Sequence, residues 1–101
     1  MNNEQKALNL LGLAMRAQNI ITGQSLSLNQ ITSERAKIVF IANDASENTK
    51  KKFLDKCQYY GIPTSLTFTE EEISQSIGKS RVVCVVTDKG FSKKLLELLS
   101  N

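Results

Sequence analysis

Ile38-Val-Phe-Ile-Ala42 and Val82-Val-Cys-Val-Val86 are the two stretches that decide the fold of this chain. Each is an unbroken run of apolar residues, most of them β-branched. Runs of this kind are typical of strands that are buried on both faces and lie centrally between layers of helices. We therefore expect a sheet that holds both runs and is covered by helices.

Upstream of the first run, the sequence predicts two helices and a short strand. Apolar residues recur at helical spacing from about Glu4 to Ala17, which predicts the first helix. Ile20-Ile21 is a short apolar stretch and predicts an edge strand. After Thr22-Gly23, a second helix is expected to carry Leu26, Leu28 and Ile31 and to extend to about Ser33.

Between the two runs, we expect a third helix, a strand and a fourth helix. Asp44 and Glu47 stand in capping-box spacing at the start of the third helix, which Gly61 ends. Ile62-Pro63 opens a strand, and Thr69 begins the fourth helix with a capping box of its own. The side chains expected to face inward on the third helix and this strand are Phe53, Leu54, Cys57, Tyr60, Leu66 and Phe68.

The fourth helix is expected to close at Gly78, and a last helix follows the second run. Asp88 should cap this helix, with Phe91, Leu95 and Leu98 facing inward. Helices and strands then alternate in the order α-β-α-β-α-β-α-β-α, which predicts a mostly parallel or mixed sheet between helix layers. The sequence therefore predicts an α/β fold, a three-layer α/β/α sandwich with a four-stranded mixed sheet.

Length and composition limit what this chain can be. With 101 residues, 41% of them hydrophobic, it has room for one domain with one core, which we place at residues 1–101. No signal peptide or membrane-spanning segment is evident near the N-terminus, so we expect a cytoplasmic protein. Cys57 and Cys84 lie far apart in apolar runs and are expected to be reduced, buried thiols.

The residues that catalysis usually needs are missing. The chain has no histidine, which removes the commonest general base and metal ligand. Gly78-Lys79-Ser80 looks like the end of a phosphate-binding loop, but that loop needs another glycine where this chain has Ile73. Asp44 and Asp88 follow strands, where aspartates usually cap helices. We therefore expect no enzyme, no cofactor and no small-molecule substrate.

Charge is compatible with a polyanionic partner. The formal net charge is +3. Lys50-Lys51-Lys52 lies in the third helix and should present a positive ridge, although such a run is also a common solvated face. Lys79 and Arg81 flank the turn at Gly78.

Several short segments, in this order along the chain, give it a family resemblance. They include Leu11-Gly-Leu-Ala-Met-Arg16, Ile21-Thr-Gly23, Asn43-Asp-Ala-Ser-Glu-Asn-Thr-Lys50, Tyr60-Gly-Ile-Pro63, Ser76-Ile-Gly-Lys79 and Val86-Thr-Asp-Lys-Gly-Phe91. Together they resemble the YlxQ-like bacterial members of the ribosomal protein L7Ae/L30e superfamily. The resemblance implies a ribosome-associated RNA-binding protein with an α/β/α fold. Superfamily members typically recognise kink-turns, which are sharply bent RNA helices with tandem sheared G·A pairs.

Carried over by position, the resemblance implies an RNA site made of two segments. They are the glycine-led start of the second helix and the loop after the fourth. The implied residues are Gly23, Gln24, Ser25 and Asn29 in the first segment, and Ile77, Gly78, Lys79, Ser80 and Arg81 in the second. A glycine at a helix start lets an RNA backbone approach closely. Lys79 and Arg81 are expected to pair with phosphates, and Ile77 to pack on a base or sugar.

Other interpretations stay open at these positions. The strong kink-turn readers resemble G-x-N-E-x-x-K, whereas this chain has Gly23-Gln-Ser-Leu-Ser-Leu-Asn29, without the acidic residue and the lysine. Gly23 also suits a plain turn, Gly78 a helix C-cap, and Ile77 a core position. We expect the partner to be structured RNA, either ribosomal RNA or an mRNA element, with the ribosome as a further partner. The alternative is a protein-interaction module of the same fold that has lost specific RNA binding.

Overall fold

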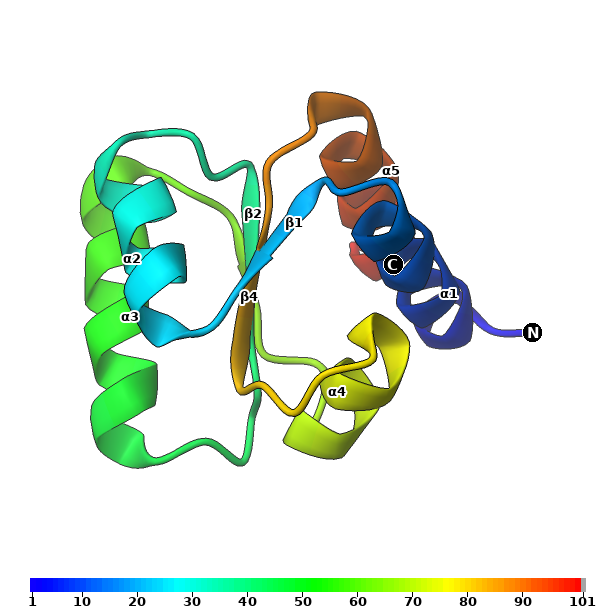
Figure 1. Cartoon of the computed structure of the whole chain (residues 1–101), viewed down its shortest axis with the longest axis horizontal. Helices are drawn as coiled ribbons and strands as arrows, with labels where there is room; N and C mark the ends of the chain where they lie inside the picture. Colours follow the sequence, from blue (N-terminus) through cyan, green and yellow to red (C-terminus); the bar gives the residue numbers. More distant parts are fainter. Residues whose placement is uncertain (101) are drawn as a thin grey trace.

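A computed structural model describes residues 1–100 and places a four-stranded sheet between two layers of helices (Figure 1). In chain order the elements are α1 (Asn3–Arg16), β1 (Ile20–Thr22), α2 (Gln24–Thr32), β2 (Ile38–Ile41), α3 (Glu47–Tyr60), β3 (Thr64–Ser65), α4 (Glu70–Ile77), β4 (Val83–Val86) and α5 (Lys89–Leu99). The predicted alternation and the three-layer sandwich are confirmed. Among the helices of residues 1–100, none has the length and apolar character needed to cross a membrane.

The sheet is mixed, with the strand order β1-β4-β2-β3. β4 is antiparallel to both β1 and β2, whereas β3 is parallel to β2. The two apolar runs therefore form the adjacent central strands, with Phe40 opposite Cys84, and every residue of both strands is buried. The edge strands β1 and β3 are only partly buried.

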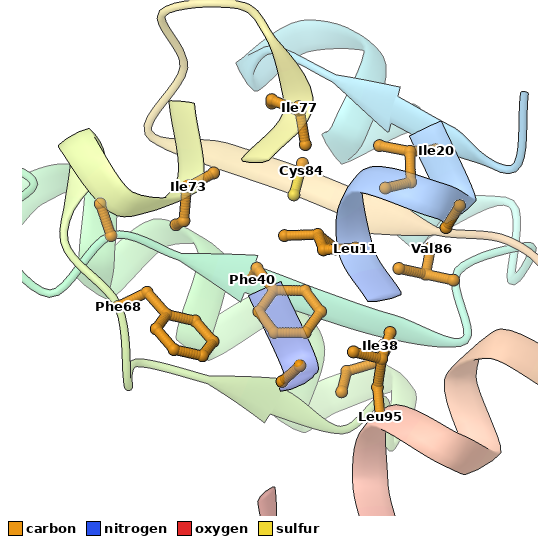
Figure 2. Packing of buried hydrophobic residues seen from close by; sticks show 13 residues of the cluster. Leu11, Ile20, Ile38, Phe40, Phe68, Ile73, Ile77, Cys84, Val86 and Leu95 are labelled. Atoms are coloured by element: carbon orange, nitrogen blue, oxygen red, sulfur yellow. The ribbon is translucent and has the colours of Figure 1, made fainter. Parts of the chain in front are cut away.

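Each face of the sheet has its own hydrophobic core. α1, α4 and α5 cover one face, and α2 and α3 cover the other (Figure 1). Because side chains alternate along a strand, Phe40 points into the first core and Val39 into the second. In the first core, the rings of Phe40 and Phe68 stack with their centroids 6.2 Å apart (Figure 2).

Local sequence signals set most of the helix ends. Thr69 and Glu72 form the predicted capping box of α4, and Asp88 accepts a hydrogen bond from the Phe91 amide at 2.8 Å. Gly61 ends α3 and Gly78 ends α4, each in the left-handed conformation. The interpretation of Gly78 as a C-cap is therefore confirmed.

The start of α3 differs from the expectation. Ser46 caps this helix, since its side chain accepts a hydrogen bond from the Thr49 amide. Asp44 instead accepts from the amide of Glu70 at 2.9 Å, so it ties the turn after β2 to the start of α4. The expected capping box of Asp44 and Glu47 is wrong because the chain makes one more turn before α3 begins.

One expected inward position also differs, and one apolar residue of α2 is exposed. β3 ends at Ser65, and Leu66 beyond it is 37% exposed, whereas Phe68 is buried. In α2, Leu26 is 61% exposed and Ser27 is fully buried. The face of α2 that meets the sheet carries Ser27 and Ile31, which are four residues apart.

Candidate nucleic-acid interface

The first half of the candidate site is the start of α2. Gly23 is the N-cap residue, with φ +91° and ψ 158°, and it has no side chain to accept hydrogen bonds from the first helical turn. Within residues 1–100, the amides of Gln24, Ser25 and Leu26 have no hydrogen-bond acceptor. Free N–H groups at the positive end of a helix dipole attract anionic groups.

The outward face of α2 carries the remaining predicted residues of this half. Gln24, Ser25 and Asn29 are all exposed, and Ser25 and Asn29 lie one helical turn apart. Leu26 joins them, because the face of α2 that meets the sheet carries Ser27 and Ile31. An exposed leucine beside free amides provides an apolar contact for a base or a ribose.

The second half is the connection between α4 and β4. Gly78, Lys79 and Ser80 are exposed, and Arg81 is half-buried. The backbone of Arg81 is fixed by Ser74, whose Oγ accepts from the Arg81 amide at 3.0 Å and donates to its carbonyl at 3.3 Å. Neither Lys79 nor Arg81 forms an ion pair with a carboxylate of residues 1–100.

The antiparallel pairing of β1 with β4 brings Gly23 and Arg81 together. The Gly23 amide donates to the carbonyl of Val83 at 3.1 Å. A Cβ atom placed on Gly23 would lie 3.7 Å from Nε of Arg81. The guanidinium therefore lies at the start of α2, where its positive charge adds to that of the helix dipole.

Ile77 does not contribute a side chain to this surface. It is 5% exposed and lies in the first core with Ile73 and Cys84 (Figure 2). The expectation that Ile77 packs on a base or sugar is therefore wrong, and its interpretation as a core residue is correct. The spacing explains this, because Ile73 and Ile77 are four residues apart on the inward face of α4.

Lys52 is a site residue that sequence reasoning did not assign. Its Nζ donates to Oε1 of Gln24 at 3.3 Å, which places a second cation beside the start of α2. The two residues are 28 positions apart in the sequence. The only sequence signal was the lysine run, and it gives no indication of which lysine faces α2.

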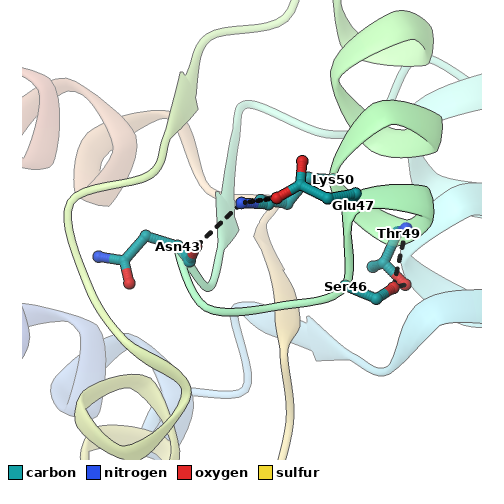
Figure 3. A network of polar contacts seen from close by, with 5 residues as sticks. All are labelled: Asn43, Ser46, Glu47, Thr49 and Lys50. Atoms are coloured by element: carbon teal, nitrogen blue, oxygen red, sulfur yellow. Dashed lines mark hydrogen bonds and ion pairs between the residues drawn. The ribbon is translucent and has the colours of Figure 1, made fainter.

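The other lysines of the run are held elsewhere. Lys50 forms an ion pair with Glu47 at 3.0 Å and donates to the carbonyl of Asn43 at 3.1 Å (Figure 3). Lys51 forms an ion pair with Asp55 at 3.0 Å. The expected positive ridge is therefore reduced to Lys52 on the side that faces the candidate site.

The flank of the site along α4 is acidic. A surface hollow beside Gly78 and Lys79 is also lined by Asp44, Glu70 and Glu71. These carboxylates oppose the charge of Lys79 and repel phosphate groups. The side of the site that favours a polyanion is thus the side of α2 and α3.

The described residues offer little for other kinds of chemistry. Residues 1–100 contain no cluster of three or more side chains that could hold a metal ion. Both cysteines are buried and free. Burial raises the pKa of the Cys57 thiol to about 11 and that of Cys84 to about 12, so neither provides a thiolate nucleophile at neutral pH.

The fold and the site define a small α/β/α protein with one basic edge suited to a polyanion. The chain belongs to the ribosomal protein L7Ae/L30e/S12e/Gadd45 family, whose model matches residues 5–96. It is 58% identical over 97 residues to the RNA-binding protein YlxQ of Enterococcus faecium, which covers 96% of this chain and 94% of that protein. It is 47% identical over 91 residues to the RNA-binding protein YlxQ of Bacillus subtilis (strain 168), covering 89% and 91%.

Solved structures confirm the fold. A protein of unknown function from Bacillus halodurans C superposes with a TM-score of 0.91 at 40% identity, over 95% of this chain and 98% of that one. The 15.5kD RNA binding protein of Giardia lamblia superposes with a TM-score of 0.81 at 18% identity, over 97% and 85%. The expectation that this protein is not an enzyme is confirmed by its family and by the names of its relatives.

Proposed function

We propose that this protein binds structured RNA through the surface formed by the start of α2, the connection between α4 and β4, and Lys52. The observation that carries the proposal is the position of the Arg81 guanidinium beside Gly23 and the free amides of the first turn of α2. The start of α2 can then bind one RNA phosphate while Arg81 binds another. The names of the two YlxQ relatives support RNA as the polyanion.

We further propose that the RNA is bent like a kink-turn and belongs to ribosomal RNA or an mRNA element, in the cytoplasm. Family membership supports this choice. Leu26 and Asn29 provide no charge on the outward face of α2, so recognition relies on backbone amides, cations and the shape of the RNA. Specificity for a base edge rests on Gln24, Ser25 and Asn29.

Binding to a standard kink-turn RNA, compared with a straight duplex of equal length across a salt series, tests this function. We expect tighter binding to the kinked RNA and a loss of affinity as salt rises, because phosphate contacts release counterions. Equal, weak binding to both would favour a different RNA. No binding to either would favour the protein-interaction module.

The double variant Lys79→Ala, Arg81→Ala tests the location of the site. We expect binding to weaken by ~1–3 kcal/mol and its salt dependence to flatten. Arg81 should account for most of the loss, because acidic side chains surround Lys79. The charge-matched control is Lys89→Ala, Lys93→Ala on α5, in the opposite layer. A similar loss in both double variants would show that only net charge matters.

A further inference from the structure

The outward face of α3 carries an aromatic and basic hollow, of which the proposed function uses only Lys52. Lys52, Asp55, Lys56, Tyr59 and Tyr60 line it. Lys52, Lys56 and Tyr59 follow one another at helical spacing, so they lie on one face over about 10 Å of helix. Tyr59 is 82% exposed, the largest value among the large apolar and aromatic side chains of residues 1–100.

The exposed Tyr59 ring has one aromatic neighbour. It meets the ring of Tyr60 edge-on, with the centroids 5.0 Å apart and the ring planes at 78°. Tyr60 in turn packs against the second core. An exposed aromatic ring of this kind can stack with a planar group such as a base.

The hollow is continuous with the proposed RNA surface. Lys52 lines the hollow and also bonds Gln24 at the start of α2. Lys56 forms no ion pair within residues 1–100, and the carboxylate of Asp55 is already paired with Lys51. An RNA strand that extends from the start of α2 along α3 therefore contacts two lysines and an aromatic ring. On the α4 flank it would face carboxylates.

We propose that this hollow binds a short unpaired RNA segment that extends from the folded RNA bound at the start of α2. This inference rests on the proposed function. The ammonium groups of Lys52 and Lys56 contact the phosphates, and one base stacks on Tyr59. The base must be unpaired, because aromatic side chains stack on bases that have left a helix. Stacking tolerates any base, so the segment is recognised by flexibility and charge and not by its sequence.

The test compares three RNAs and four proteins. One RNA is a standard kink-turn with blunt ends. The other two are the same kink-turn with an unpaired five-nucleotide extension on one strand or on the other. The proteins are the natural sequence, Tyr59→Ala, Tyr59→Phe and Lys93→Ala. Lys93 is an exposed lysine on α5 in the opposite layer and controls for net charge. We expect one of the extensions to tighten binding of the natural protein on the order of 10-fold, as for one stacked base.

Tyr59→Ala should bind the blunt RNA as tightly as the natural protein does, and the extension should no longer raise its affinity. Tyr59→Phe and Lys93→Ala should keep the gain in affinity from the extension. Lack of a gain in the natural protein, with the blunt RNA still bound, overturns this inference and leaves the proposed function intact. A gain in affinity that survives Tyr59→Ala also overturns it, because the extension is then bound without the Tyr59 ring. If the blunt kink-turn is not bound, the proposed function fails. The five-nucleotide strand alone then decides the inference, which is overturned unless the natural protein binds it more tightly than Tyr59→Ala.

Discussion

Gly23 joins β1 to α2 with φ +91° and ψ 158°, a region that residues with a Cβ atom rarely enter. Space is not the restriction, because the nearest atom to an added Cβ is Nε of Arg81 at 3.7 Å. We expect Gly23→Ala to lower the free energy of unfolding by ~1–3 kcal/mol through backbone strain. Urea denaturation measures this, with the exposed Ser25→Ala as the neutral control. Equal stability of the two variants would show that the start of α2 relaxes without strain.

Strain at Gly23 also affects how RNA-binding measurements on variants of this residue are interpreted. Any larger residue at Gly23, such as valine, would block RNA and also strain the chain at the point where Arg81 is positioned. Loss of binding in such a variant therefore reports on close approach only where its stability has been measured alongside. The Lys79→Ala, Arg81→Ala variant is free of this difficulty, because within residues 1–100 the side chain of Arg81 bonds only the neighbouring Ser80 carbonyl.

Ser27 and Ser65 are two buried serines, of which only Ser65 has a hydrogen-bonded hydroxyl within residues 1–100. The Ser27 hydroxyl is fully buried and has no partner within residues 1–100, whereas Ser65 Oγ donates to Thr67 Oγ1 at 3.1 Å and accepts from its amide at 3.3 Å. We expect Ser27→Ala to raise the free energy of unfolding by ~0.5–1.5 kcal/mol, because it removes a buried unpaired hydroxyl and favours the helix. Ser65→Ala should lower it by about 1 kcal/mol. Urea denaturation of both variants measures the contrast, and losses of similar size would contradict it.

At the scale of elements, the contact between α1 and α4 depends on Gly12. A Cβ added there would lie 3.0 Å from the carbonyl oxygen of Ser76, which is fixed in the last turn of α4. We expect Gly12→Ala to lower the free energy of unfolding by about 1 kcal/mol, because overpacking outweighs the better helix propensity of alanine. Thermal unfolding followed by circular dichroism measures this. A more stable variant would show that α1 can move away from α4 at little cost.

The elements that the sequence predicts best are those with two agreeing local signals. The central strands are unbroken apolar runs, and α4 has both a capping box and a closing glycine. The sequence predicts the wrong cap for α3, because Asp44 and Ser46 both suit an N-cap. The long-range bond from the Glu70 amide to Asp44 is what separates them. Capping signals are local, whereas the choice between neighbouring caps is tertiary.

The sequence predicts most residues of the candidate site but not how they are arranged in space. Ile77 belongs to the core, and its spacing from Ile73 already indicates this. The contact between Gly23 and Arg81 requires the antiparallel register of β1 and β4, and the bond from Lys52 to Gln24 requires the packing of α3 on α2. Neither arrangement has a local signature in the sequence, because both join segments that meet only after folding.

At the scale of the whole molecule, charge is distributed unevenly around the proposed site. Lys52 and Arg81 stand on the side of α2 and α3, whereas Asp44, Glu70 and Glu71 line the hollow on the α4 side. The net charge of +3 describes the whole chain and does not reveal the difference in local charge between the two flanks. Under the proposed function, this difference in charge directs RNA along α3 and away from α4.

The two thiols couple the stability of the whole molecule to alkaline pH. Burial raises the pKa of Cys57 from 9.0 to about 11 and that of Cys84 from 9.0 to about 12. Because the unfolded thiols ionise first, this stabilisation is complete below pH 9 and is lost as the pH rises from 9 through the folded pKa values. We expect the free energy of unfolding to fall in that interval by on the order of 1 kcal/mol per pH unit for each thiol.

Cys84→Val isolates the contribution of one thiol. Valine suits the buried strand β4, and every other residue is the same in both proteins, so its effect cancels in the comparison. The measurement is urea denaturation from pH 8 to 11 of the natural protein and the variant. The natural protein should lose stability more steeply above pH 9. Parallel curves would mean that the Cys84 thiol ionises in the folded protein as readily as in the unfolded chain, which its complete burial in the first core argues against.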